Sequence, residues 1–77
     1  MNIIKLNLRI KTGYHHSDPN ANGITFVNVD KIDFYYDESH DGYKSVISIN
    51  SKEFKCTASA AEITERIDLA EIADNLA

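Results

Sequence analysis

Apolar and polar residues alternate along much of this chain, and the period changes from two to that of a helix only near its end. Over residues 2–11, every second residue from Ile4 to Ile10 is apolar, and lysine, asparagine or arginine stands between them. A period of two is typical of a β-strand with one buried face. Related patterns rich in β-branched and aromatic residues predict further strands over about 24–28, 31–37, 43–50 and 53–57.

The pattern also predicts the turns and the faces of these strands. Residues 12–23 are rich in Gly, Pro, Asn, Asp and Ser, which predicts an exposed loop, and residues 28–30 predict a bend that keeps two strands in register. Alternation over 31–37 places three side chains inward: Ile32, Phe34 and Tyr36. Four apolar side chains are expected on the opposite face: Ile3, Val27, Tyr35 and Val46.

A helical period begins after the last strand and predicts a helix over about 60–76. Ser59 and Glu62 have the spacing of a capping box, in which the hydroxyl accepts from an amide of the first turn and the carboxylate reaches back. Apolar residues then follow at helical spacing, with acids on the other faces. A second cap signal at Asp68 leaves open whether the helix is broken there into two short helices.

Strands followed by a terminal helix indicate an α+β fold. We expect one domain over residues 1–77, a twisted antiparallel sheet of about five short strands with one C-terminal helix. If the helix covers one face of the sheet, the other face still carries apolar residues. That second face is therefore available for a homo-oligomer, with a dimer as the first expectation, or for a protein partner.

Length, composition and charge disfavour several classes of protein. A chain of 77 residues leaves no room for two separate cores, and no stretch approaches the roughly 20 apolar residues of a membrane span. No basic leader precedes an apolar block, so we expect a cytoplasmic protein with no membrane contact. The lone cysteine, Cys56, provides no internal disulfide. A net charge of -4 disfavours nucleic acid as a partner, because phosphate binding needs a concentrated basic surface.

The 12–23 loop contains candidate ligands for an ion. His15, His16 and Asp18 offer two imidazoles and a carboxylate, a donor set suited to a transition metal. The run from Asp18 also matches the first half of a calcium loop, but position twelve falls at Val29 in place of a carboxylate. A solvated loop remains the simpler interpretation, and we expect no cofactor.

The sequence offers little support for an enzyme. Cys56 stands in a strand beside Phe54, where a buried small apolar side chain is expected rather than an activated thiol. The acids at 37, 38 and 41 stand at a predicted hairpin tip, where a solvated turn is expected rather than a buried acid–base pair. Glycine-rich phosphate loops and redox cysteine pairs are absent from the sequence. We therefore predict no catalytic residues.

Tyrosines and acids are the candidate partner-binding residues. Tyrosine provides large contact area at low entropic cost, and the acidic helix offers charge to steer a partner. The hypothesis names five residues: Tyr35, Tyr43, Val46, Glu62 and Glu65.

From Thr25 to Ile67 the chain resembles the small FlbD-type proteins associated with bacterial flagella and swarming motility. The residues that carry the resemblance are Phe26, Asn28, Asp30, Ile32, Val46, Ile47, Ile49, Phe54, Cys56, Ser59, Glu62, Ile63 and Ile67. The resemblance implies a flagellar or motility accessory role. The chain is also similar to short acidic reading frames of bacteriophages and other mobile elements, which implies an inhibitor of host machinery.

Together these patterns predict a small non-catalytic protein-interaction module. Two alternatives stay open at this point: a metal- or small-ligand-binding domain that uses the 12–23 loop, and a motility accessory protein.

Overall fold

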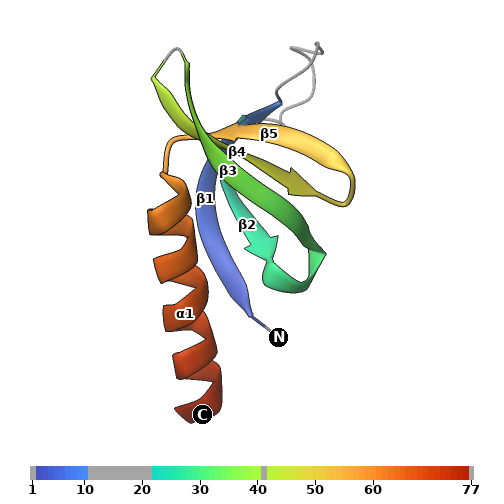
Figure 1. Ribbon diagram of the computed structural model, residues 1–77. Coiled ribbons are helices and arrows are strands. Elements are labelled where there is room, and N and C mark those ends of the chain that lie inside the picture. Colours follow the sequence, from blue (N-terminus) through green and yellow to red (C-terminus); the bar gives the residue numbers. More distant parts are fainter. Residues whose placement is uncertain (1, 11–21, 41, 77) are drawn as a thin grey trace.

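The computed structural model describes residues 2–10, 22–40 and 42–76 of the chain. They form a five-stranded antiparallel sheet and one C-terminal helix, which confirms the predicted α+β fold class (Figure 1). The elements are β1 (Ile3–Ile10), β2 (Asn22–Asn28), the 3-10 turn η2 (Val29–Lys31), β3 (Ile32–His40), β4 (Tyr43–Ile49), β5 (Lys52–Cys56) and α1 (Ala60–Leu76). The helix runs unbroken through Asp68. No helix in the described part of the chain is long and apolar enough to cross a membrane.

The sheet is curled because its two edges are joined by a very short connection. The strand order is β2-β1-β5-β4-β3, so β2 and β3 lie at opposite edges although only η2 separates them in sequence. The predicted bend at 28–30 is present, but the strands that it joins are not neighbours. The Asn28 side chain accepts from the Asp30 N–H at 3.0 Å and caps this turn. A turn of three residues can join the two edges only if the twist of the sheet brings them together.

One apolar core fills the inner face of the curled sheet. Its buried members come from four strands, the segment after β5 and the helix: Ile4, Leu6, Leu8, Val27, Ile47, Cys56, Ala58 and Ile63. The expectation that Val27 faces outward is wrong. It pairs with Ile4 across an unshifted register and is 3% exposed, so the odd positions of β2 point inward and Ile24 and Phe26 point out.

The inward face predicted for residues 31–37 is confirmed at Ile32 but wrong at Phe34 and Tyr36, because a register shift between Ile32 and Phe34 changes the alternation. Ile32 and Tyr35 pack against the core, whereas Phe34 and Tyr36 are exposed. The rings of Phe34 and Tyr36 stack on the outer face with centroids 6.2 Å apart. Asp33 holds the irregularity in place, since its carboxylate accepts from the Ser48 hydroxyl at 3.0 Å and the Ser51 N–H at 2.8 Å.

The turn between β4 and β5 gives a stability prediction. Asn50 and Ser51 form a two-residue hairpin loop with φ of 52° and 68°, and Ser51 carries a side chain in this left-handed region. Because glycine adopts such a conformation without a steric cost, Ser51→Gly is expected to raise the free energy of unfolding by about 0.5–1 kcal/mol in urea titrations. Lys52→Gly, one residue later and at ordinary φ, is the matched control and should be destabilising. A loss of stability in Ser51→Gly would show that the turn is not strained.

The helix is fixed to the sheet at its N-terminal half. The predicted capping box is confirmed: the Glu62 N–H donates to the Ser59 hydroxyl at 3.1 Å, and the Ser59 N–H donates to the Glu62 carboxylate at 3.2 Å. The hydroxyls of Tyr35 and Thr64 share a hydrogen bond of 2.6 Å that ties α1 to β3. Farther along α1, Ile67 and Ala70 also pack against the core. The helix extends alongside β1, and its residues 71–75 are exposed (Figure 1).

Candidate functional site

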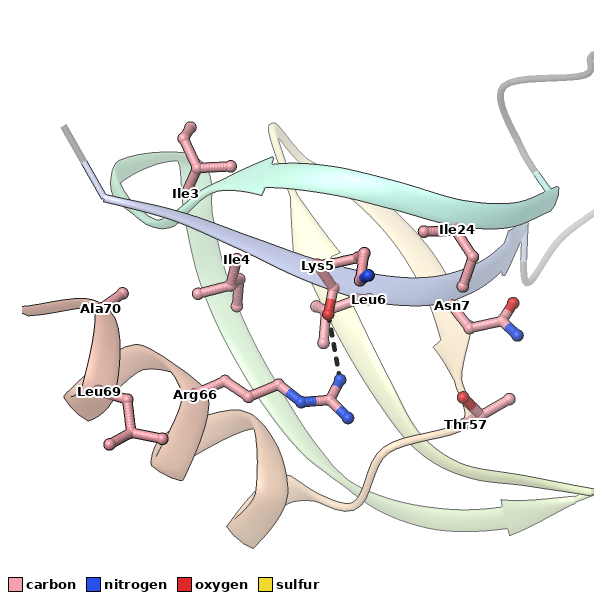
Figure 2. A pocket seen from close by; sticks show the side chains of 10 residues that line it. All are labelled: Ile3, Ile4, Lys5, Leu6, Asn7, Ile24, Thr57, Arg66, Leu69 and Ala70. Carbon is pink, nitrogen blue, oxygen red and sulfur yellow. Dashed lines mark hydrogen bonds between the residues drawn. The ribbon is translucent and has the colours of Figure 1, made fainter. Parts of the chain in front are cut away.

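A groove lies between α1 and the first half of β1 (Figure 2). Its volume is about 520 Å³, within the range of ligand sites on proteins. Its lining comes from β1, β2, the segment after β5, and α1: Ile3, Ile4, Lys5, Leu6, Asn7, Ile24, Thr57, Arg66, Leu69 and Ala70.

The groove exists because β5 is shorter than β1. The pairing of β5 with β1 covers only Leu8, Arg9 and Ile10. One further backbone bond, from the Thr57 N–H to the Asn7 carbonyl at 3.3 Å, extends this contact before the chain turns into α1. On the side of β1 that faces α1, the backbone from Ile3 to Asn7 therefore has no strand beside it in the described part of the chain.

The register shows which backbone groups face this open edge. In an antiparallel ladder, alternate residues bond to opposite neighbours. The bond from the Val29 N–H to the Asn2 carbonyl shows that the backbone N–H and C=O groups of even residues in β1 point toward β2. The bond from the Thr57 N–H to the Asn7 carbonyl shows that those of odd residues point the other way, toward the groove. The N–H and C=O groups of Ile3, Lys5 and Asn7 therefore point into the groove.

Two of these carbonyls have partners. The Asn7 carbonyl accepts from Thr57, and the Lys5 carbonyl accepts from an Nη1 of Arg66 at 3.1 Å, drawn as the dashed line in Figure 2. For the Ile3 carbonyl and the three N–H groups, the structure records no partner among the residues that it describes. Backbone groups at an open edge are ready to pair with another strand.

Apolar side chains flank the open edge. Ile4 and Leu6 are buried on its core side, whereas Ile3, Ile24 and Leu69 form an exposed rim, with Ile24 62% and Leu69 58% accessible. Apolar side chains that gather around a groove mark an interaction surface more strongly than the same residues scattered singly.

The groove is basic although the protein is acidic. Among the described residues that line it, the charged ones are Lys5 and Arg66, and none is an aspartate or glutamate. The chain as a whole carries a net charge of -4. Lys5 and Arg66 give this lining a positive formal charge, which favours an anionic group placed directly against it.

None of the five residues predicted to bind a partner lines this groove. Tyr35 is half-buried and bonded to Thr64, and Tyr43 is half-buried opposite His40 at the end of the β3–β4 hairpin. Val46 does face outward, but it is 1% exposed. Its cross-strand neighbours on that face are Tyr36 and Lys55, and the shift in β3 turns Tyr36 to this side.

The two acids of that set have different surroundings. Glu62 closes the capping box and lies 3.6 Å from the Lys44 ammonium, whereas Glu65 is exposed on α1. The Ser59 N–H, the Ser59 hydroxyl and the nearby Lys44 charge lower the pKa of Glu62 below its usual value.

The lowered pKa of Glu62 makes the stability of the fold depend on pH. Because its pKa is lower in the folded state, ionised Glu62 stabilises the fold above the ordinary glutamate pKa, and this contribution disappears as the pH falls through the lowered value. Glu62→Gln should therefore melt below wild type at pH 7 and converge with it in acid. Glu65→Gln is the control, with no capping contact. A gap between Glu62→Gln and wild type that persists in acid would contradict the role of the carboxylate charge.

The predicted metal ligands His15, His16 and Asp18 lie outside the described residues, so the metal site stays a prediction. Across residues 2–10, 22–40 and 42–76, no three His, Cys, Asp or Glu side chains gather where they could hold a metal ion. Cys56 is fully buried in the core, as its place in a strand predicted.

No family model, curated protein or solved structure matches this chain.

Proposed function

We propose that this protein is a small non-catalytic protein-interaction module whose partner binds in the groove between α1 and β1. The observation that carries the proposal is the open edge of β1, from Ile3 to Asn7, with apolar side chains on both sides of it. A partner that covers this edge removes apolar area from water and gives the free backbone groups hydrogen-bond partners.

The side chains of the groove suit binding rather than bond-breaking chemistry. Its polar members are Lys5, Asn7, Thr57 and Arg66, which can hold and orient a ligand through charge and hydrogen bonds. Residue types that commonly serve as a nucleophile or a general base, such as Cys, His, Asp and Glu, are not among the described residues that line the groove.

Site-specific photocrosslinking tests the proposal. A photoreactive phenylalanine analogue at Leu69 lies on the rim of the groove, and the same analogue at Phe34 lies at a similarly exposed position on the outer face of β3. In cells that express the protein naturally, we expect a discrete crosslinked product from position 69 and none from position 34. Equal products from both positions, or a product from position 34 alone, would contradict the groove as the binding site.

Light scattering of the purified protein then shows whether the partner is a different protein or a second copy of this chain. A monomer whose position-69 product contains a different protein indicates a heteromeric module. A dimer whose product joins two copies of this chain shows that the groove is filled by a second copy, whereas the sequence led us to expect a dimer through the second face of the sheet.

A further inference from the structure

We infer that the partner presents an extended acidic peptide segment, which pairs with the open edge of β1 as an added strand. This inference rests on the proposed function and specifies the chemistry of the partner. It follows from the backbone groups at the edge, the side chains on its two faces and the charge of the groove.

The backbone groups of the edge repeat at the spacing of an extended chain. The residues that point into the groove are Ile3, Lys5 and Asn7, two residues apart, which is roughly 7 Å in a strand. An extended peptide laid beside β1 presents its own N–H and C=O groups at the same spacing. A helical segment satisfies its backbone internally and offers no such ladder. The edge therefore favours a partner segment in the extended conformation. This mode of binding is known as strand addition.

The side chains beside the edge select an alternating sequence. A strand added to β1 points every second side chain toward the core face, beside Leu6 and Ala70, and the others toward the outer face, beside Lys5. The core-side positions require apolar side chains. The outer positions favour acids, because the positively charged side chain of Lys5 lies on that face and lines the groove.

Arg66 occupies the place of the added strand in the free protein. Its guanidinium donates to the Lys5 carbonyl, a bond that an incoming strand would replace with its own N–H (Figure 2). The released guanidinium then lies beside the bound segment, where a carboxylate can accept two hydrogen bonds from it. An acidic peptide compensates for the lost bond, whereas a neutral or basic peptide does not.

Fluorescence anisotropy with defined peptides tests the charge. The probe is a fluorescein-labelled hexapeptide of alternating valine and glutamate, and its controls replace glutamate with threonine or lysine. We expect the valine–glutamate peptide to bind at least about tenfold more tightly than the valine–lysine peptide, with affinity that falls as salt rises. Equal affinity of the acidic and basic peptides would overturn the inference.

N-methylation of the probe tests the backbone pairing. Methyl groups on one alternate set of amide nitrogens remove the donors that face β1, whereas methyl groups on the other set remove donors that face away. We expect one frame to lose at least about tenfold in affinity and the other to change much less. Equal effects in both frames would show that side chains alone hold the peptide and would overturn strand addition.

Variants of the protein test the role of Arg66. Arg66→Ala should bind the valine–glutamate peptide about tenfold more weakly and the valine–threonine peptide at least as well as wild type, because the carbonyl of Lys5 is left open. Arg9→Ala is the matched control, since Arg9 lies on the same sheet opposite Lys55 and outside the groove lining. Thermal melts of both variants check folding, and Lys5→Ala provides a second groove variant if Arg66→Ala unfolds. Identical binding by wild type and the groove variants would overturn the inference.

Selection from a random peptide display library separates this inference from the proposed function. Enrichment of alternating acidic and apolar sequences that compete with the probe supports both. If the selection instead enriches helical or basic peptides, and Leu69→Glu no longer binds them, the acidic strand is overturned. The proposal of an interaction module is then still supported. A selection without groove-dependent peptides, together with equal crosslinking at positions 69 and 34, overturns both.

Discussion

Replacing Ile63 with alanine is expected to lower the free energy of unfolding by about 2–5 kcal/mol. Ile63 lies in the first turns of α1, is fully buried and belongs to the core formed with β1, β2, β4 and β5. Its truncation removes apolar burial and leaves a cavity under the part of the helix that holds α1 on the sheet. A domain of this size has a total stability of roughly 4–12 kcal/mol, so the variant should be partly unfolded at moderate temperature.

Ile72→Ala is the matched control for that change. Ile72 lies farther along the same helix and is 54% exposed, so its truncation should alter the stability by no more than about 0.5 kcal/mol. Urea unfolding followed by circular dichroism measures both variants. Similar losses from Ile63→Ala and Ile72→Ala would mean that α1 is not anchored through its N-terminal half.

Ser45→Ala is expected to lower the free energy of unfolding by about 1–3 kcal/mol, which is a large effect for the loss of one oxygen atom. Ser45 is fully buried, and its hydroxyl donates to the carbonyl of Ala58 at 2.6 Å. Ala58 is buried as well, at the point where the chain leaves β5 to begin the helix. Without the hydroxyl, this carbonyl loses its partner in a place that water does not reach.

Ser48→Ala tests whether the effect comes from burial of the acceptor. The Ser48 hydroxyl also donates to an acceptor, at 3.0 Å, but that acceptor is the exposed carboxylate of Asp33, which keeps its bond from the Ser51 N–H. We therefore expect Ser48→Ala to cost clearly less than Ser45→Ala in the same urea titration. Equal costs would show that the Ala58 carbonyl finds another partner when Ser45 is truncated.

The strands, the helix and its cap could be predicted from the sequence because each depends on residues close in the chain. Alternation marks the strands, and Ser59 and Glu62 mark the start of α1. The faces of β3 could not be predicted in this way, because the register shift after Ile32 depends on Asp33 bonding to groups in β4 and its turn. One irregular residue moves the side chains that follow it to the opposite face of the sheet.

The groove could not be predicted because it depends on which strands pair. Nothing local in residues 2–11 indicates that β5 will lie beside their second half, or that Arg66 will reach Lys5 across 61 residues of sequence. One signal was available: the last predicted strand is about half as long as the first. A long strand beside a short one leaves an open edge, and this comparison could have directed attention to Ile3–Asn7. Residue type alone, which marks the tyrosines and the acids, carries no information about which strand edge stays open.

Amide hydrogen exchange along β1, measured by NMR, tests the open edge most directly. Ile4 and Leu6 face β2 in the ladder and should exchange slowly, whereas the Lys5 amide between them points into the groove and should exchange much faster. Addition of the valine–glutamate peptide should slow Lys5 alone among the three. Equal protection of Ile4, Lys5 and Leu6 in the free protein would show that the edge is already paired and would contradict the account.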